Sequence, residues 1–249
     1  MFYKVKQALK WLIIPTLLVL VLTWYFKEPL RLAAWNEDVS VLAQVELSED
    51  KSTLSFKGLR DWRYELNKVV SKDYFAQAYK LEDLERVWFY SQPLDSTGLL
   101  AHTFVVFEFN ESYGDRRELG ISLEARKKVG EEYGMWKGAF KGFTLTHVWA
   151  NAKDIVTRRT IYWDYELPLQ KHELQLSDAD AQGLLKAFVA ETNELHQQPR
   201  FYNTLTYNCA NALAYYANKA KPGSVPWHYS FILTGKSVEY LNKLGYIKN

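Results

Sequence analysis

Hydrophobic and polar positions alternate along much of residues 36–249, which is the pattern of half-buried β-strands. The alternation, with its β-branched and aromatic residues, predicts strands over 39–47, 52–66, 84–93, 102–109, 118–126, 141–150 and 154–167. A charged turn separates the first two strands. A turn around Gly114 joins the strands 102–109 and 118–126 into the clearest hairpin.

Two stretches in the last third of the chain carry apolar residues at helical spacing instead. The first begins after Ser177, a predicted N-cap, and its apolar face comprises Leu184, Leu185, Phe188, Val189 and Leu195. The second begins near Cys209, with Asn208 or Thr206 as its cap. A mostly antiparallel sheet followed by helices predicts an α+β fold for a single domain over 36–249.

The N-terminal segment has a different pattern. Residues 11–26, WLIIPTLLVLVLTWYF, carry no charge and follow three lysines within the first ten residues. We expect a transmembrane anchor over 11–26, with residues 1–10 in the cytoplasm, 27–35 as a linker and 36–249 outside. A cleaved signal peptide is the alternative, but bulky aromatic residues and Lys27 stand where small residues should precede the cleavage site.

Composition narrows the classes of function. The 249 residues hold 31 basic and 29 acidic side chains without a basic tract, so nothing indicates nucleic-acid binding. Aromatic residues make up 16%, which suits a β-rich domain or a protein near a membrane. No histidines or carboxylates have the spacing of a metal site, and we expect neither a metal nor a cofactor.

Cys209 is the only cysteine, so the chain has no internal disulfide. A single cysteine in an apolar helix is most simply a buried packing residue. Its predicted place in the first turn of a helix favours the alternative, because the helix N-terminus stabilises a thiolate and lowers the pKa of the thiol. A nucleophilic role would also require an imidazole as base.

His102 has the best context for that base. The period of two puts His102 and Glu124 on one face of the hairpin, and a turn symmetric about Tyr113 puts them opposite each other. A carboxylate in that place fixes the tautomer of the imidazole. A shift of two residues in register would offer Ser122 or Arg126 instead. The remaining histidines have weaker contexts: His147, His172, His196 and His228.

Four blocks appear in order along the chain: AHTFVVFEF, GISLEARKKVGEEYG, DIVTRRT and FYNTLTYNCANAL. Together they resemble the Lnb N-terminal periplasmic domain family of bacterial envelope proteins. That family is similar to permuted NlpC-type, papain-like thiol enzymes, in which a strand histidine precedes a helix-borne cysteine. The resemblance implies Cys209 as nucleophile and His102 as base, and it implies acyl transfer to a lipoprotein amino terminus. Such an acyltransferase would carry further membrane spans, which this chain lacks.

The sequence therefore predicts a periplasmic cysteine acyltransferase or hydrolase, anchored in the bacterial inner membrane and acting on a lipid or lipoprotein acyl group. The candidate catalytic residues are Cys209, His102 and Glu124, and the candidate substrate or oxyanion residues are Asn208, Ser122 and Arg126. The expected partners are a membrane lipid or lipoprotein and a membrane protein that supplies further helices. A cell-wall peptide amidase on the same fold and a non-catalytic envelope scaffold are the alternatives.

Overall fold

One mixed sheet forms the centre of the part of the chain that the structure, a computed structural model, describes: residues 14–19 and 21–248. Its strands are β1 (Gln44–Leu47), β2 (Thr53–Glu65), β3 (Lys68–Lys80), β4 (Leu84–Pro93), β5 (Ala101–Phe109), β6 (Glu118–Arg126), β7 (Phe143–Asn151), β8 (Gln170–Glu173) and β9 (Phe201–Tyr202). The order is β1-β2-β7-β6-β5-β4-β8, with β3 on β2 and β9 on β7. β2 and β7 run parallel where Arg60 pairs with Ala150, and this contact makes the sheet mixed.

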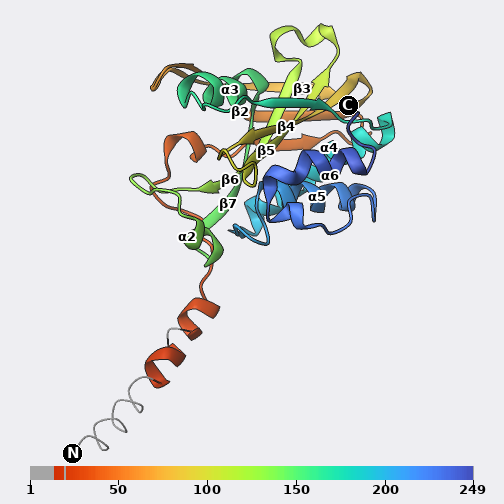
Figure 1. Cartoon of the computed structure of the whole chain (residues 1–249). Helices are drawn as coiled ribbons and strands as arrows, with labels where there is room; N and C mark the ends of the chain where they lie inside the picture. Colours follow the sequence, from red (N-terminus) through yellow and green to blue (C-terminus); the bar gives the residue numbers. More distant parts are fainter. Residues whose placement is uncertain (1–13, 20, 249) are drawn as a thin grey trace, which may run out of the picture.

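Helices lie on both sides of the sheet (Figure 1). One side carries α4 (Asp178–Gln197), α5 (Cys209–Ala220) and α6 (Ser237–Lys243), and the other carries α3 (Ala152–Thr157) and the π-helix η4 (Arg158–Tyr162). A short α2 (Met135–Ala139) precedes β7. The remaining short helical turns are η1 (Glu37–Val39), η2 (Leu81–Asp83), η3 (Glu111–Arg116), η5 (Tyr229–Phe231) and η6 (Thr234–Lys236). The described chain is therefore an α+β protein.

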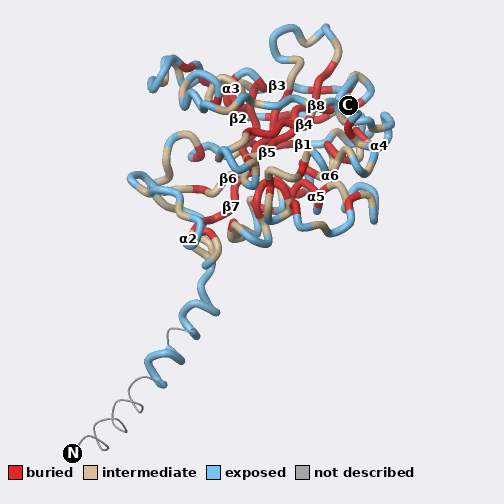
Figure 2. Tube along the Cα trace, viewed as in Figure 1, coloured by how far each residue is buried: buried red, intermediate tan, exposed pale blue. Residues whose placement is uncertain are grey.

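The alternation of side chains along β5 explains why helices can pack on both faces. Val105 and Phe107 belong to the main core with Phe188 of α4, whereas Phe104 packs against Ile155 of α3 on the opposite face. All four of these β5 and α3 side chains, like most of the sheet, are buried (Figure 2). Burying an aromatic or aliphatic side chain of this size contributes about 1.5–3 kcal/mol, so both faces of β5 stabilise the fold.

The β5–β6 hairpin has the predicted register, symmetric about Tyr113. Phe104 pairs with Ser122, and the ladder continues toward the turn. Away from the turn, the pairing between β5 and β6 ends at Phe104 and Ser122. Beyond that point β5 still pairs with β4, where His102 is opposite Gln92, and β6 still pairs with β7. The two strands therefore separate beyond Phe104 and Ser122, next to His102.

Two sequence expectations about the helices also hold at their N-termini. The Ser177 hydroxyl accepts a hydrogen bond from the backbone N–H of Asp180, and Asn208, not Thr206, caps α5. The strand predicted over 154–167 is wrong, because this region forms α3 and the π-helix η4. Asn151 caps α3, and the carboxylate of Asp154 is fully buried against the Arg60 guanidinium, which holds the segment in helical form.

The expectation of a transmembrane anchor over 11–26 is wrong for the described residues, since none of their helices is long and apolar enough to cross a membrane. Residues 14–19 and 21–25 are helical, whereas 1–10, 11–13 and 20 lie outside the described residues. The physical reason is length. Sixteen residues at 1.5 Å each extend about 24 Å, less than the roughly 30 Å of a hydrocarbon core.

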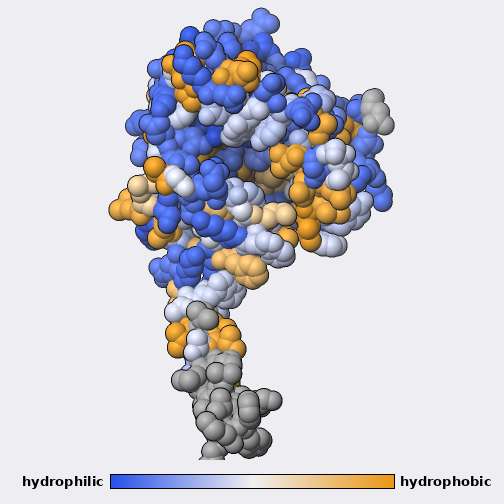
Figure 3. Space-filling view, turned by 60° about the vertical axis from the view of Figure 1, so that its left-hand side comes forward, coloured by the Kyte–Doolittle hydropathy of each residue, from blue (hydrophilic) through white to orange (hydrophobic). Residues whose placement is uncertain are grey.

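Residues predicted as a linker lie against the domain. The backbone N–H of Leu30 donates to the hydroxyl of Thr144 on β7, and the carbonyl of Ala34 accepts from the N–H of Val129. The Lys141 ammonium donates to the carbonyls of Trp24 and Tyr25. Above this segment the surface of the domain is largely hydrophilic, with a hollow near its centre and hydrophobic groups beside the hollow (Figure 3).

Candidate active site

A pocket of about 310 Å³ lies where β5 and β6 separate. Its lining includes Cys209 from α5, His102 from β5, Glu124 from β6 and Arg159 from the π-helix η4. These residues come from both faces of the sheet, and the interrupted strand pairing is what allows them to share one pocket.

Cys209 is the first residue of α5 and its side chain is buried, with 5% of the residue exposed. Its Sγ atom lies 3.9 Å from the carbonyl oxygen of Ala101, at the start of β5. Thr103, two residues further along β5, lowers the pKa of the thiol. The thiol is therefore held against the beginning of β5, inside the pocket.

Asn208 positions the thiol. Its Oδ1 atom accepts hydrogen bonds from the N–H groups of Ala210 and Asn211, and its Nδ2 atom donates to the carbonyls of Thr204 and Phe231. Both hydrogens of the amide are used, so the Asn208 side chain has no donor left for a substrate. It fixes the start of α5 as an N-cap.

His102, Ser122 and Glu124 form a hydrogen-bonded chain. The His102 Nε2 atom lies 2.9 Å from the Ser122 hydroxyl oxygen, and that hydroxyl donates to Glu124 Oε1 at 2.7 Å. The direct distance from His102 Nε2 to Glu124 Oε1 is 3.5 Å. Because the Ser122 proton is given to Glu124, Ser122 accepts from His102, and the imidazole carries its proton on Nε2. The Nδ1 atom is left as the acceptor.

Arg159 of η4 completes this network. Its guanidinium lies 3.4 Å from Glu124 Oε1 and 3.5 Å from the Ser122 hydroxyl, and it donates to the carbonyl of Ile155. The ring of Phe104 lies 4.8 Å below it. π-helical turns are often found at functional sites, and here the π-helix η4 aims Arg159 at the carboxylate.

Burial and neighbouring charges set the protonation states. Burial lowers the pKa of His102, and Arg159 lowers it further, although Glu124 raises it. Burial alone would raise the pKa of Glu124, but a positive charge on His102 when its ring is protonated, the charges of Arg159 and Arg158, and the hydrogen bond from Ser122 together lower that pKa. The imidazole is therefore neutral and the carboxylate ionised at neutral pH.

The pKa of Cys209 is raised, mainly by burial, and this corrects the expectation of a lowered value. Thr103 and the Ala210 N–H lower it, but Glu124 adds to the increase. The helix N-terminus stabilises a thiolate in its first turn by only about 0.3–1 kcal/mol. Loss of solvation outweighs that effect here, so the resting thiol is neutral.

The thiol and the imidazole approach the pocket from different faces of β5. Ala101 and Thr103 contact Cys209, and His102 between them points toward the α3 side, where Arg159 lies. Among the described residues, no hydrogen bond joins His102 to Cys209. Their side chains share the lining of one pocket.

Arg126 lies outside this arrangement. It is buried, donates to the carbonyls of Val39 and Ser40, and stacks on Trp35. It lines a different pocket, beside His147 and His196. Arg126 therefore secures the chain ahead of β1.

No group of three or more His, Cys, Asp or Glu side chains is arranged to hold a metal ion within residues 14–19 and 21–248. The pocket brings together a thiol, an imidazole, a carboxylate and a guanidinium.

Comparison with known families gives one match. Residues 71–235, more than half of the chain, match the family described as the Lnb N-terminal periplasmic domain. The chain belongs to this family. Every residue of the pocket network, from His102 to Cys209, lies inside the matched range. The membership places the domain in the periplasm, as part of the bacterial envelope. No curated protein and no solved structure matched the chain.

Proposed function

We propose that this Lnb N-terminal domain is a periplasmic thiol enzyme that transfers or hydrolyses the acyl group of a lipid or lipoprotein. The observation that carries the proposal is the pocket shared by the Cys209 thiol and the imidazole of His102, with Ser122 and Glu124 behind the ring. A nucleophile, a base and a group that orients the base are what acyl transfer requires. The resemblance to permuted NlpC-type thiol enzymes supports the same roles.

In the first step the Cys209 sulfur attacks the carbonyl carbon of an ester. The C–S bond forms as the S–H proton passes to Nδ1 of His102, whose Nε2 proton is held by Ser122. The C–O bond then breaks, and His102 returns the proton to the leaving alcohol. In the second step an amine or water attacks the thioester, gives its proton to His102 and releases the thiol, which regains that proton.

The neutral thiol and the neutral imidazole make His102 a general base and not a partner in a preformed ion pair. In the proposed mechanism the hydrogen bond between the thiol and the imidazole forms when substrate binds, as catalytic hydrogen bonds often tighten only at that stage. Glu124 stays ionised, and its charge stabilises the imidazolium that forms.

The oxyanion of the tetrahedral intermediate needs hydrogen-bond donors. The N–H groups of Ala210 and Asn211 donate to Asn208, and the Asn208 amide is itself fully engaged. Since the first N–H groups of a helix have no partner within it, we assign the oxyanion to the N–H of Cys209.

Trapping of the acyl-enzyme tests the proposal. The purified domain is incubated with a p-nitrophenyl acyl ester, and its intact mass is measured. A mass increase of one acyl group that is absent in Cys209→Ala and in His102→Ala supports the proposal. A wild-type protein that never gains the acyl group, while cleaving a cell-wall peptide, would assign the pocket to an amidase. A protein inert to both would be a scaffold.

A further inference from the structure

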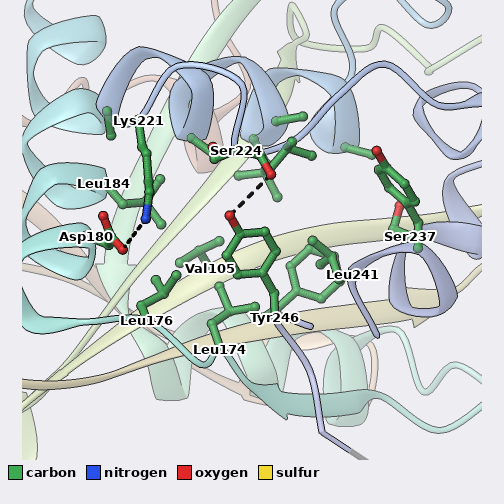
Figure 4. A pocket seen from close by; sticks show the side chains of 18 of the residues that line it. Val105, Leu174, Leu176, Asp180, Leu184, Lys221, Ser224, Ser237, Leu241 and Tyr246 are labelled. Atoms are coloured by element: carbon green, nitrogen blue, oxygen red, sulfur yellow. Dashed lines mark hydrogen bonds and ion pairs between the residues drawn. The ribbon is translucent and has the colours of Figure 1, made fainter. Parts of the chain in front are cut away.

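Cavities away from the thiol pocket differ in how their charges are compensated. A cavity of about 100 Å³ beside α5 has mostly apolar walls, and its charged residues Asp180 and Lys221 pair with each other at 2.8 Å (Figure 4). Another cavity, of about 310 Å³, is lined by residues of β7, α4 and the segment 30–32. The described residues that line it include Arg31 and Arg126 but no Asp or Glu. We call it the arginine cavity.

The arginine cavity lies beside a gap in the sheet. On the side of β7 that faces away from β6, β9 pairs only with the first two residues of β7, and β2 pairs only with Ala150. Between these contacts β7 has no neighbouring strand on that side among the described residues. Thr146 and His147 come from this stretch and line the cavity. The gap therefore lets residues from both faces of the sheet share one space.

Arg126 is a buried cation without a counter-ion. Only 6% of the residue is exposed, and its Nε and Nη2 atoms donate to the carbonyls of Val39 and Ser40. No carboxylate in the described part of the chain offsets its burial, which lowers the pKa of the guanidinium to about 10. Burial and the charge of Arg126 lower the pKa of His196, which lines the same cavity. Because buried charges are normally paired, the guanidinium lacks a negative partner.

Thr146 is the second incomplete group in this cavity. Only 2% of the residue is exposed, and its Oγ1 atom has no hydrogen-bond partner among the described residues. Arg126 pairs with Thr144, two positions before Thr146, so Arg126 and Thr146 are diagonal neighbours on one face of the sheet. Buried hydroxyl groups normally have a partner. A negatively charged oxygen between the two side chains would accept from both.

We propose that the arginine cavity binds the phosphate group of a small ester. Arg126 and Thr146 donate to its oxygens inside the cavity, and the exposed Arg31 donates at the mouth. Leu42 and Leu195 contact the organic part of the ester. A volume of about 310 Å³ has room for that part, since small-molecule sites begin near 300 Å³. Phosphate binding does not depend on the proposed function, because the arginine cavity and the thiol pocket share no lining residue.

The arrangement of the donors favours phosphate over carboxylate. A carboxylate is planar and is bound best by two parallel N–H groups of one guanidinium. Two carbonyls already occupy the edge of Arg126 formed by Nε and Nη2. A phosphate group presents three acceptor oxygens in different directions. This geometry matches donors that come from β6, from β7 and from the segment 30–32.

Isothermal titration calorimetry of the full chain with phenyl phosphate tests the site. The wild type and Cys209→Ala should bind the probe equally. Arg126→Met should weaken binding about tenfold or more, and Thr146→Val about threefold. Thr146→Val should not lower the urea midpoint, because its hydroxyl has no partner to lose. Thr146→Ser keeps the hydroxyl and should bind like the wild type.

Arg31→Ala and Arg63→Ala form a matched pair at exposed positions. Arg31→Ala should weaken binding, whereas Arg63→Ala, on β2 and outside the cavity, should not. This pair decides the question if Arg126→Met fails to fold. The proposal would be overturned by a wild type that does not bind phenyl phosphate, by unchanged binding in both Arg31→Ala and Thr146→Val, or by tighter binding of benzoate than of phenyl phosphate.

Vesicles distinguish a soluble ester from a lipid headgroup as the source of the phosphate. The full chain is sedimented with vesicles of phosphatidic acid or of phosphatidylcholine. Co-sedimentation with phosphatidic acid alone, abolished by Arg31→Ala and by excess phenyl phosphate, would support the site and assign it to a lipid phosphate. Binding of phenyl phosphate without co-sedimentation would support the site with a soluble ester as its ligand.

Discussion

The imidazole of His102 is 2.9 Å from the hydroxyl of Ser122 and 3.5 Å from the carboxylate of Glu124. The serine therefore stands between the base and the acid that orients it. Two residues on one face of β6 share a role that a single Asp or Glu usually fills. Both can be tested separately, because the serine supplies the contact and the glutamate supplies the charge.

Ser122→Ala should reduce kcat/KM on the order of tenfold to a hundredfold, less than the full contribution of a general base, because the ring keeps its charge partner but loses its fixed orientation. Ser122→Thr retains the hydroxyl and should recover most of the activity. Steady-state kinetics on a p-nitrophenyl ester measure both. Equal activity of Ser122→Ala and the wild type would show that the serine only packs.

Cys209→Ala should abolish acyl transfer and change the free energy of unfolding by about 1 kcal/mol or less, since only a small buried group is removed. Because burial raises the pKa of the thiol, wild-type Cys209 should alkylate slowly with iodoacetamide at pH 7 and faster at pH 9. Urea denaturation and mass spectrometry measure the two effects. Rapid alkylation at pH 6 would contradict the raised pKa.

Arg159→Met should shift the acidic limb of the pH profile of kcat/KM to higher pH. The positive charge of Arg159 lowers the pKa of His102, so its removal raises that pKa, and the base then becomes protonated at a higher pH. Arg159→Lys keeps the charge and should retain the wild-type profile. An acidic limb that stays in place in Arg159→Met would show that the guanidinium does not act on the base.

Asp154→Ala should destabilise the domain by about 3–5 kcal/mol, because it leaves the buried Arg60 guanidinium without its partner. Arg60 Nε and Nη2 both donate to this carboxylate, as does the N–H of Trp62. Glu65→Ala removes an exposed partner of Lys68 and should leave the urea midpoint almost unchanged. Comparable midpoints for the two variants would contradict the role given to the buried pair.

The sequence predicts the β5–β6 hairpin well because its two strands alternate and its turn is symmetric about Tyr113. It does not predict β3, since polar and half-exposed residues occupy both faces of this strand beside β2. The same alternation puts His102 and Glu124 on one face, which the structure shows. In the structure that face is turned toward α3, and the alternation alone does not predict to which side of the sheet it turns.

Arg159 is the site residue that the sequence does not indicate. The segment DIVTRRT has β-branched residues and reads as a strand, but the cap at Asn151 and the pairing of Asp154 with Arg60 make it helical. Arg60 lies 94 residues before Asp154 in the sequence, so no local pattern predicts that the two residues pair. The sequence does not predict the raised pKa of Cys209 either, because the burial of the thiol depends on elements that are distant in the sequence.

The matched family range ends at residue 235, whereas α6 and the residues after it cover the cavity beside α5. Cys209, His102 and their supporting groups therefore lie inside the matched range, whereas Tyr240, Leu241 and Tyr246 lie beyond it. The proposed catalytic groups and the outer wall of that cavity therefore come from separate parts of the chain. Exchange of residues 236–249 alone should therefore leave the hydrogen-bonded chain of His102, Ser122 and Glu124 in place.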